Sequence, residues 1–167
     1  MPFDVILGSS FGDGSRRRVV DQKLHPGFDR HSLSHDIGLL LLATPVETGP
    51  FPTLRRLDPM LEGRSVRLAS LRVGSPSASD TRTGTGPKAI IISVEPTRVT
   101  IGVRPGQACS GDSGSPAMVD IDGVEHLLGV ASFGGSGCEG PLRFTRVDAY
   151  LESFIEPYIR AARVARH

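Results

Sequence analysis

The chain has 167 residues, enough for one domain or for two small lobes that share a core. Apolar residues make up 38% and charged residues 22%, a balance that excludes a disordered chain. The formal net charge of +1 gives no global field to attract nucleic acid or an anionic membrane. No apolar stretch is long enough to span a bilayer, and the N-terminal residues lack the pattern of an export signal.

The first half of the chain predicts three short strands. Residues 3–8 and 17–24 are the first two, and a turn rich in glycine and serine separates them. The sequence His25-Pro26-Gly27 ends the second strand, because proline cannot donate to a strand ladder. Residues 37–42 form an apolar run, which predicts a strand buried on both faces. Residues 45–64 are rich in Pro, Gly, Arg and Asp, and we interpret them as a connector between two lobes.

The second half predicts further strands and one helix. The stretch Val99–Val103 alternates between apolar and other residues, as a half-buried strand does. Apolar residues from Val147 to Ile159 recur with helical period, with Asp148 as the expected N-cap and Pro157 as the expected end or kink. The predicted strands are residues 66–73, 89–94, 98–103, 116–119 and 127–133.

The most informative local pattern surrounds Ser113. The sequence Gly111-Asp112-Ser113-Gly114 places a serine between glycines on a tight turn, where backbone N–H groups can approach a ligand closely. The N–H groups of Gly111 and Ser113 could converge on one point, as an oxyanion hole requires. Taken alone, the tetrapeptide is equally compatible with a plain turn. The two cysteines, Cys109 and Cys138, allow either one disulfide or two buried free thiols.

Several segments, in the same order along the chain, resemble the trypsin-like serine proteases of the chymotrypsin fold. Residues 111–116, Gly-Asp-Ser-Gly-Ser-Pro, are close to that family's Gly-Asp-Ser-Gly-Gly-Pro. Residues 129–134, Gly-Val-Ala-Ser-Phe-Gly, are similar to its Gly-Ile-Val-Ser-Trp-Gly. Residues 24–28 and 35–40 are similar to its His-Pro-x-Tyr and Asn-Asp-Ile-Ala-Leu-Leu segments, and residues 144–147 lead into a terminal helix as in the family.

The resemblance implies an all-β fold, a chymotrypsin-like double β-barrel with an incomplete first barrel and a C-terminal helix. We assign residues 1–58 to the partial first barrel and crossover, and residues 59–146 to the second barrel with the nucleophile loop. Residues 147–167 are assigned to the C-terminal helix and tail.

The resemblance also implies catalytic roles. Ser113 is the acylating nucleophile, the N–H groups of Gly111 and Ser113 form the oxyanion hole, and Asp36 orients the base histidine. In the family, Cys109 and Cys138 would form a disulfide between the nucleophile loop and the wall of the specificity pocket. Such proteins are secreted or periplasmic, although this chain shows no signal peptide.

Five positions are implied to bind substrate. Ser132, Phe133 and Gly134 form the edge that pairs with the substrate backbone. The floor of the specificity pocket falls on Gln107, which is not Asp, so we expect no strong preference for Lys or Arg. A wall position that is usually Gly falls on Leu142, which predicts a pocket that is shallow, occluded or tuned to small side chains.

The family's base histidine precedes its aspartate by about 45 residues, a position that would lie before Met1. We interpret the five histidines of the chain, His25, His31, His35, His126 and His167, as solvated or structural. Without a general base, Ser113 is an ordinary alcohol, and we expect negligible peptidase turnover from this chain. Its first barrel should also leave apolar surface and unpaired strand edges.

Three functional hypotheses follow. The first is a serine endopeptidase that works through an acyl-enzyme, truncated or impaired because the histidine is absent. The alternative is a non-catalytic protease homologue that binds a protein or peptide, with the sub-case of an enzyme completed by a separate N-terminal fragment. An α/β-hydrolase is disfavoured because position 115 is Ser where Gly-x-Ser-x-Gly needs Gly, and because no helix-alternating pattern occurs. We predict a polypeptide substrate or protein ligand, no cofactor and no metal.

Overall fold

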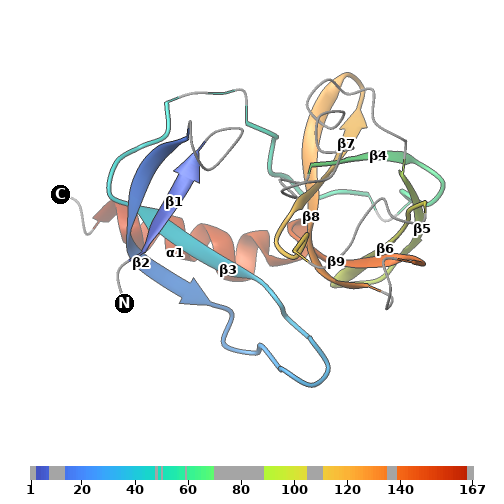
Figure 1. The fold of residues 1–167 in the computed structure, drawn as a ribbon, viewed down its shortest axis with the longest axis horizontal. Helices are drawn as coiled ribbons and strands as arrows, with labels where there is room; N and C mark the ends of the chain where they lie inside the picture. Colours follow the sequence, from blue (N-terminus) through green and yellow to red (C-terminus); the bar gives the residue numbers. More distant parts are fainter. Residues whose placement is uncertain are drawn as a thin grey trace.

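The computed structural model describes residues 3–7, 14–47, 49, 51–58, 60–69, 89–104, 111–134 and 139–164. Figure 1 shows two lobes joined by a connector, with a closed barrel on one side and a smaller sheet on the other. The last helix lies against the smaller sheet, far from the N-terminal strands in sequence but beside them in space.

The first lobe is a three-stranded antiparallel sheet in the order β1-β2-β3. Its strands are β1 (Asp4–Leu7), β2 (Ser15–Leu24) and β3 (Gly38–Leu42). A bulge between Val19 and Asp21 shifts the register of β2 against β3, so side chains change faces there.

The second lobe is a closed barrel in the order β4-β5-β6-β9-β8-β7, with every neighbouring pair antiparallel. Its interior is filled by alternate strand residues, of which Val99, Ile101 and Leu128 are fully buried. The hairpin between β7 and β8 closes on Asp122 and Gly123, both with positive φ, as a two-residue hairpin turn requires. The strands are β4 (Ser65–Leu68), β5 (Ala89–Val94), β6 (Arg98–Gly102), β7 (Pro116–Ile121), β8 (Val124–Gly134) and β9 (Leu142–Arg146).

The C-terminal segment is three helical pieces. A 3-10 turn at Asp148–Tyr150 and a π-helical turn at Leu151–Ile155 precede the α-helix α1 (Glu156–Val164). Of the two expectations for Pro157, an end of the helix is wrong, because Pro157 lies in the first turn of α1, where a missing N–H is tolerated; the change from the π-helical turn to α1 falls at Glu156, next to it. The prediction that Asp148 is the N-cap is also wrong, since Val147 holds that position and no side chain caps it.

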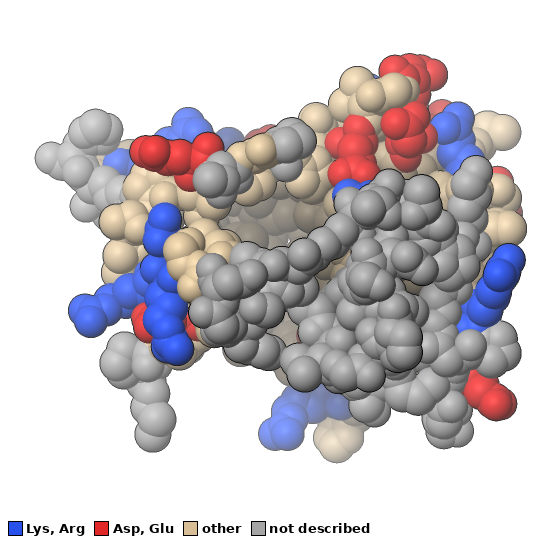
Figure 2. Space-filling view, turned by 45° about the horizontal axis from the view of Figure 1, so that its top comes forward, with Lys and Arg blue, Asp and Glu red and all other residues tan. Residues whose placement is uncertain are grey.

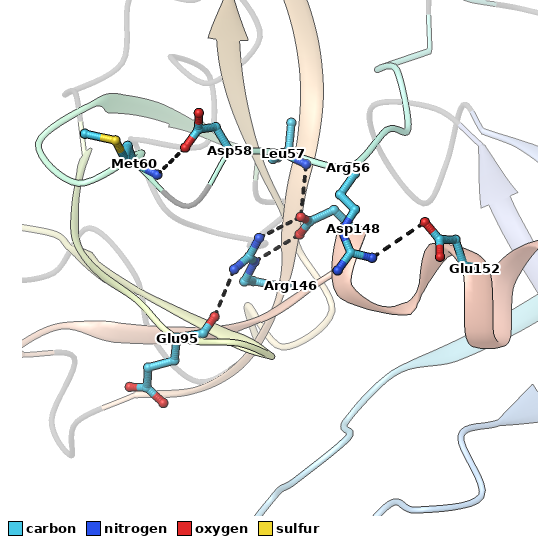
Figure 3. Close-up of polar contacts among 8 residues, drawn as sticks. All are labelled: Arg56, Leu57, Asp58, Met60, Glu95, Arg146, Asp148 and Glu152. Carbon is cyan, nitrogen blue, oxygen red and sulfur yellow. Dashed lines mark hydrogen bonds and ion pairs between the residues drawn. The ribbon is translucent and has the colours of Figure 1, made fainter.

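Asp148 instead belongs to a buried ion pair at the junction of the barrel, the connector and the terminal segment (Figure 3). Arg146 donates to it through Nε at 3.0 Å and through Nη2 at 2.6 Å, and both side chains are nearly buried. The same carboxylate accepts the backbone N–H of Leu57 at 3.1 Å, and Arg146 Nη1 donates to the carbonyl of Glu95 at 3.0 Å. The connector is held further by Thr53, whose N–H and C=O bond to β8.

A second apolar cluster joins the first lobe to the terminal segment. Ile37, immediately before β3, packs with Val147, Tyr150, Phe154 and Ile155, all of them buried. Tyr158 Oη on α1 donates to the Asp21 carboxylate on β2 at 2.8 Å. The first lobe is therefore held mainly by the end of the chain.

The prediction of a strand buried on both faces at residues 37–42 is wrong. Leu40 of β3 is 48% exposed and Leu24 of β2 is 67% exposed, because the helix covers one face of the small sheet only. The all-β architecture is confirmed, and β9 is a strand that the sequence did not predict. The domain boundaries at residues 58 and 146 stay predictions. On the face drawn in Figure 2, acidic and basic side chains are interspersed without one large patch of a single sign.

Candidate active site

Ser113 lies on a tight turn that is fixed against strand β8. Ser115 N donates to Asp112 O at 2.9 Å, and the flanking Gly111 and Gly114 have φ values of 97° and 83°, which favour glycine. Gly114 N donates to Ala131 O at 2.8 Å, and Ala131 N donates to Ser115 O at 2.9 Å. The turn thus presents Ser113 exposed to solvent while its neighbour Asp112 is buried.

The backbone of this turn leaves two N–H groups available. Within the described residues, the N–H groups of Gly111 and Ser113 make no hydrogen bond. A Cβ placed on Gly111 would meet no atom of the described residues within 4 Å. This is the arrangement that an oxyanion hole needs, with donors fixed by the fold before a ligand arrives.

Asp36 is brought to the same strand. The Ser132 hydroxyl donates to Asp36 Oδ2 at 2.6 Å, a short bond to a charged acceptor. Ser132 directly follows Ala131, which holds the nucleophile turn, so the carboxylate and Ser113 are positioned by adjacent residues of β8. The structure therefore joins Asp36 to Ser132, next to the residue of β8 that holds the turn of Ser113, and the catalytic roles of Asp36 and Ser113 stay predictions.

The described histidines have other contacts. His25 and His35 stack with ring centroids 4.8 Å apart and 12° between their planes. His35 Nδ1 lies 3.0 Å from Tyr150 Oη, and His25 Nδ1 accepts the N–H of Gly27 at 3.1 Å. Burial lowers the pKa of His25, and the neighbouring His35 lowers it further.

His35 directly precedes Asp36 but points elsewhere, because its positive φ of 54° turns the chain between them. His126 is buried in the barrel wall, and its Nδ1 has no partner among the described residues. His31 is exposed. In the part of the chain that the structure describes, none of these four histidines is hydrogen-bonded to Ser113 or Asp36.

Strand β8 offers an edge beside the nucleophile turn. Its pairing with β7 ends at Val130, opposite Pro116, while β8 continues to Gly134. Past the two bonds of Ala131, the residues Ser132 to Gly134 have no strand partner on that side within the described ranges. An extended peptide can add to such an edge through main-chain hydrogen bonds.

Two arginines that the sequence reasoning missed lie over Phe133. The Cζ atoms of Arg98 and Arg143 are 5.5 Å and 5.3 Å from the centre of the ring, within cation–π range. Arg143 is the cross-strand partner of both Phe133 and Thr100, and Arg98 lies two residues before Thr100 on β6. Knowledge of the β9 register would have placed them there, but β9 itself was not predicted.

Leu142 lies where the predicted pocket wall would be. It is the cross-strand partner of Gly134, and a Cβ on Gly134 would overlap the Leu142 side chain. Leu142 also packs against the apolar core of the barrel. Its isobutyl group thus lies against Gly134 on the β9 side of β8, toward the barrel core.

Comparison with known proteins identifies the family. Residues 3–154 match the family description Trypsin. The chain belongs to the trypsin family. It is 32% identical to a chymotrypsin of Phaedon cochleariae over 146 residues, 77% of this chain and 51% of that protein. It is 38% identical to a venom protease of Bombus pensylvanicus over 55 residues, 32% of this chain and 23% of that protein.

The solved structures agree with this trypsin-family assignment. Kallikrein-related peptidase 10 has a TM-score of 0.70 and 26% identity, and the match covers 96% of this chain and 79% of that chain. Its complex with Zn2+ has a TM-score of 0.64 and 27% identity, covering 90% of this chain and 76% of that chain. The chain spans about half the length of the Phaedon chymotrypsin and less of the venom protease. The predicted family and chymotrypsin fold are confirmed.

Several predicted site residues of this trypsin-family chain lie outside the described residues: Gln107, Cys109, Cys138 and His167. The pocket floor and the disulfide therefore stay predictions. Among the described residues, no group of three or more His, Cys, Asp or Glu side chains could hold a metal ion. No helix in the described ranges is long and apolar enough to cross a membrane.

Proposed function

We propose that this chain carries the nucleophile of a serine endopeptidase that cleaves polypeptides through an acyl-enzyme. The observation that supports this most is the 2.6 Å bond from Ser132 to Asp36, formed beside the fixed turn of Ser113. Asp36 is partly buried, and its Oδ2 is already bonded, so its other oxygen is preorganised to orient an imidazole. Trypsin-family membership supports the same chemistry.

The proposed reaction has two displacements. Ser113 Oγ bonds to the carbonyl carbon of the substrate while its proton passes to a base, and the N–H groups of Gly111 and Ser113 stabilise the oxyanion. The C–N bond then breaks, and the amine leaves with the proton from the base. Water, activated by the same base, releases the acyl group and restores the Ser113 hydroxyl.

We propose that the described histidines do not supply that base. His25 and His35 stack on one another and lie against Tyr150, and His126 is buried in the barrel wall. Asp36 Oδ1 would accept the N–H of an imidazole delivered by another segment, either preceding this one or on a separate fragment. Without it, only the oxyanion hole and binding contribute to rate, a residual of about 10³- to 10⁴-fold over water.

Labelling with a fluorophosphonate probe tests both parts of the proposal. We expect slow labelling of the chain that the Ser113→Ala variant abolishes, because the hydroxyl reacts without a base. Rapid labelling would show that an effective base is present. Labelling that survives in Ser113→Ala would overturn the assignment of the nucleophile.

A second candidate function is peptide binding without turnover. The open edge at Ser132–Gly134 favours it, and so does Leu142, whose side chain fills the space beside Gly134 at the predicted pocket wall. This candidate predicts that a peptide binds Ser113→Ala as tightly as the unchanged chain and is not cleaved. Cleavage of the peptide by the unchanged chain would exclude it.

We further propose secretion and a Cys109–Cys138 disulfide, as the trypsin family implies. A loop of about 30 residues closed in this way is stabilised by roughly 3 kcal/mol in the chain-entropy model. Thiol counting under denaturing, non-reducing conditions tests the disulfide. Two free thiols would contradict it.

A further inference from the structure

Two positively charged side chains lie close to the ring of Phe133, on the proposed peptide-binding edge. Arg98 and Arg143 come from two different strands, β6 and β9, yet both guanidinium groups lie within 6 Å of the ring centre. Phe133 itself is half-buried, and it directly follows Ser132, whose hydroxyl binds Asp36. A cationic aromatic platform therefore adjoins the proposed catalytic residues.

The two guanidinium groups are held differently. Arg98 Nη2 donates to Ser32 O at 2.7 Å and lies 3.4 Å from Ser34 Oγ, so the loop before Asp36 fixes it in place. Arg143 is exposed, and its side chain makes no hydrogen bond within the described ranges. Neither arginine is within 4 Å of a carboxylate oxygen among the described residues, so the positive charge near Phe133 is not neutralised by an ion pair there.

The nearest loop does not supply a compensating negative charge. Residues 29–35 contain the exposed side chains of Arg30 and His31 and one carboxylate, Asp29. Asp29 Oδ1 accepts three hydrogen bonds, from the N–H of His31, the N–H of Ser32 and the Ser32 hydroxyl. These bonds lower the pKa of Asp29 and direct the carboxylate into its own loop.

We propose that Arg98 and Arg143 form a subsite that selects an acidic side chain in a polypeptide bound along β8. This rests on the proposed function, because it requires a peptide on the Ser132–Gly134 edge. Side chains of an added strand point alternately toward and away from the sheet face, so one of them lies over Phe133. A Glu or Asp there would gain hydrogen bonds from a guanidinium that is already positioned.

The distribution of charge suits a peptide carboxylate better than a nucleic acid as the ligand of this subsite. The chain has a net charge of +1, and the two arginines form an isolated pair and not a stripe that could follow a phosphate backbone. Exposed ion pairs are individually weak, so two of them together give roughly a twofold to thirtyfold preference. That preference should weaken as salt screens the pair.

The test uses two fluorescent tetrapeptide diphenyl phosphonates, which differ only in Glu or Gln at one position, moved in turn through the non-reacting residues. The same peptides with a free C-terminal amide are measured by fluorescence anisotropy, which needs no reaction at Ser113. At one position we expect the Glu peptide to bind roughly twofold to thirtyfold better at low salt, and its phosphonate to label faster by a similar factor if Ser113 reacts. Equal anisotropy for Glu and Gln at every position overturns the subsite.

Arg143→Gln is the diagnostic variant, because the Arg143 side chain has no hydrogen bond to lose within the described ranges. It should remove most of the Glu preference and leave binding of the Gln peptide unchanged, whereas Arg143→Glu should reverse the preference. Arg163→Gln, on α1, changes the net charge equally and should preserve the preference. A loss in Arg163→Gln as large as in Arg143→Gln would reduce the effect to net charge and overturn the proposal. An anisotropy difference that persists while neither phosphonate labels would support the subsite, and the missing labelling would bear only on the proposed nucleophile and its base.

Discussion

The two lobes are built from similar strands but bury them differently. The barrel closes on itself, and its interior residues Leu128, Val99 and Ile101 are fully buried by partners within the same lobe. The first lobe has three strands, leaves Leu24 and Leu40 exposed, and depends on the terminal segment to cover its other face. Strand propensity is thus sufficient to form both sheets, whereas closure decides which of them has its own core.

The two proposed catalytic residues belong to different lobes. Ser113 belongs to the barrel, since its turn is bonded to β8. Asp36 belongs to the first lobe and reaches the barrel through Ser132. Damage to the first lobe should therefore disturb Asp36 while the nucleophile turn stays in place.

The largest expected effect comes from the junction between the lobes. Asp148→Ala leaves Arg146 buried without its partner and removes the acceptor of Leu57 N–H. Removing one member of a buried pair lowers the free energy of unfolding by about 3–5 kcal/mol. Urea unfolding measures this. Glu152→Gln breaks the exposed Arg56–Glu152 pair and is the matched control, with an expected change below about 0.5 kcal/mol.

Truncating one leucine in each lobe tests directly whether the two lobes differ in burial. Leu128→Ala in the barrel should lower the free energy of unfolding by about 2–5 kcal/mol, because it leaves a cavity. Leu24→Ala on the exposed sheet face should change it by less than about 0.5 kcal/mol. Similar losses in both variants would mean that the face of the small sheet is covered in solution.

A smaller effect is expected where α1 meets β2. Burial, and then the hydrogen bond to Asp21, raises the pKa of Tyr158 to about 12. The chain has two tyrosines and no tryptophan, so absorbance titration of the phenols is simple to interpret. Tyr158→Phe should remove the high-pH step and lower the free energy of unfolding by about 0.5–1.5 kcal/mol. If the step that Tyr158→Phe removes lies at the ordinary tyrosine pKa, the contact is contradicted.

The smallest effect is a pH dependence in the first lobe. The folded pKa of His25 is lowered by burial and by the facing His35, with Tyr150 and Phe154 completing the ring contacts. Between the lowered pKa and the ordinary value near 6.5, the unfolded chain binds more protons. Stability should therefore rise with pH across this window and decrease as pH falls through it.

Urea midpoints between about pH 5 and pH 7 measure this slope. His25→Asn should flatten it, since the amide oxygen can still accept the Gly27 N–H but carries no titrating proton. An unchanged slope in that variant would assign the pH dependence to other groups.

The sequence was informative where chemistry is local. Ser113 between glycines, Asp36 and Ser132 could each be singled out because each motif lies within a few residues, whereas the bond from Ser132 to Asp36 was not predicted. The roles of distant partners were not predicted either. Asp148 bonds a backbone group 91 residues away, and an N-cap pattern cannot reveal that.

Burial and register were the other failures, for a related reason. The apolar run at residues 37–42 shows that a strand forms but not how many layers cover it, so the exposure of Leu40 was missed. Arg98 and Arg143 became neighbours of Phe133 only through the pairing of β9 with both β6 and β8. Such pairing follows from barrel closure, which no short window of sequence contains.

The clasp of the terminal segment on Ile37 has a consequence for the order of synthesis. On the ribosome, β1, β2 and β3 emerge before the residues that cover them. Their apolar face stays uncovered until Val147 and the residues after it have been made. The Asp36–Ser132 contact likewise joins residues 96 positions apart. Chaperones would thus be needed while the first lobe is still uncovered. The proposed catalytic carboxylate, Asp36, would reach its final position late in folding.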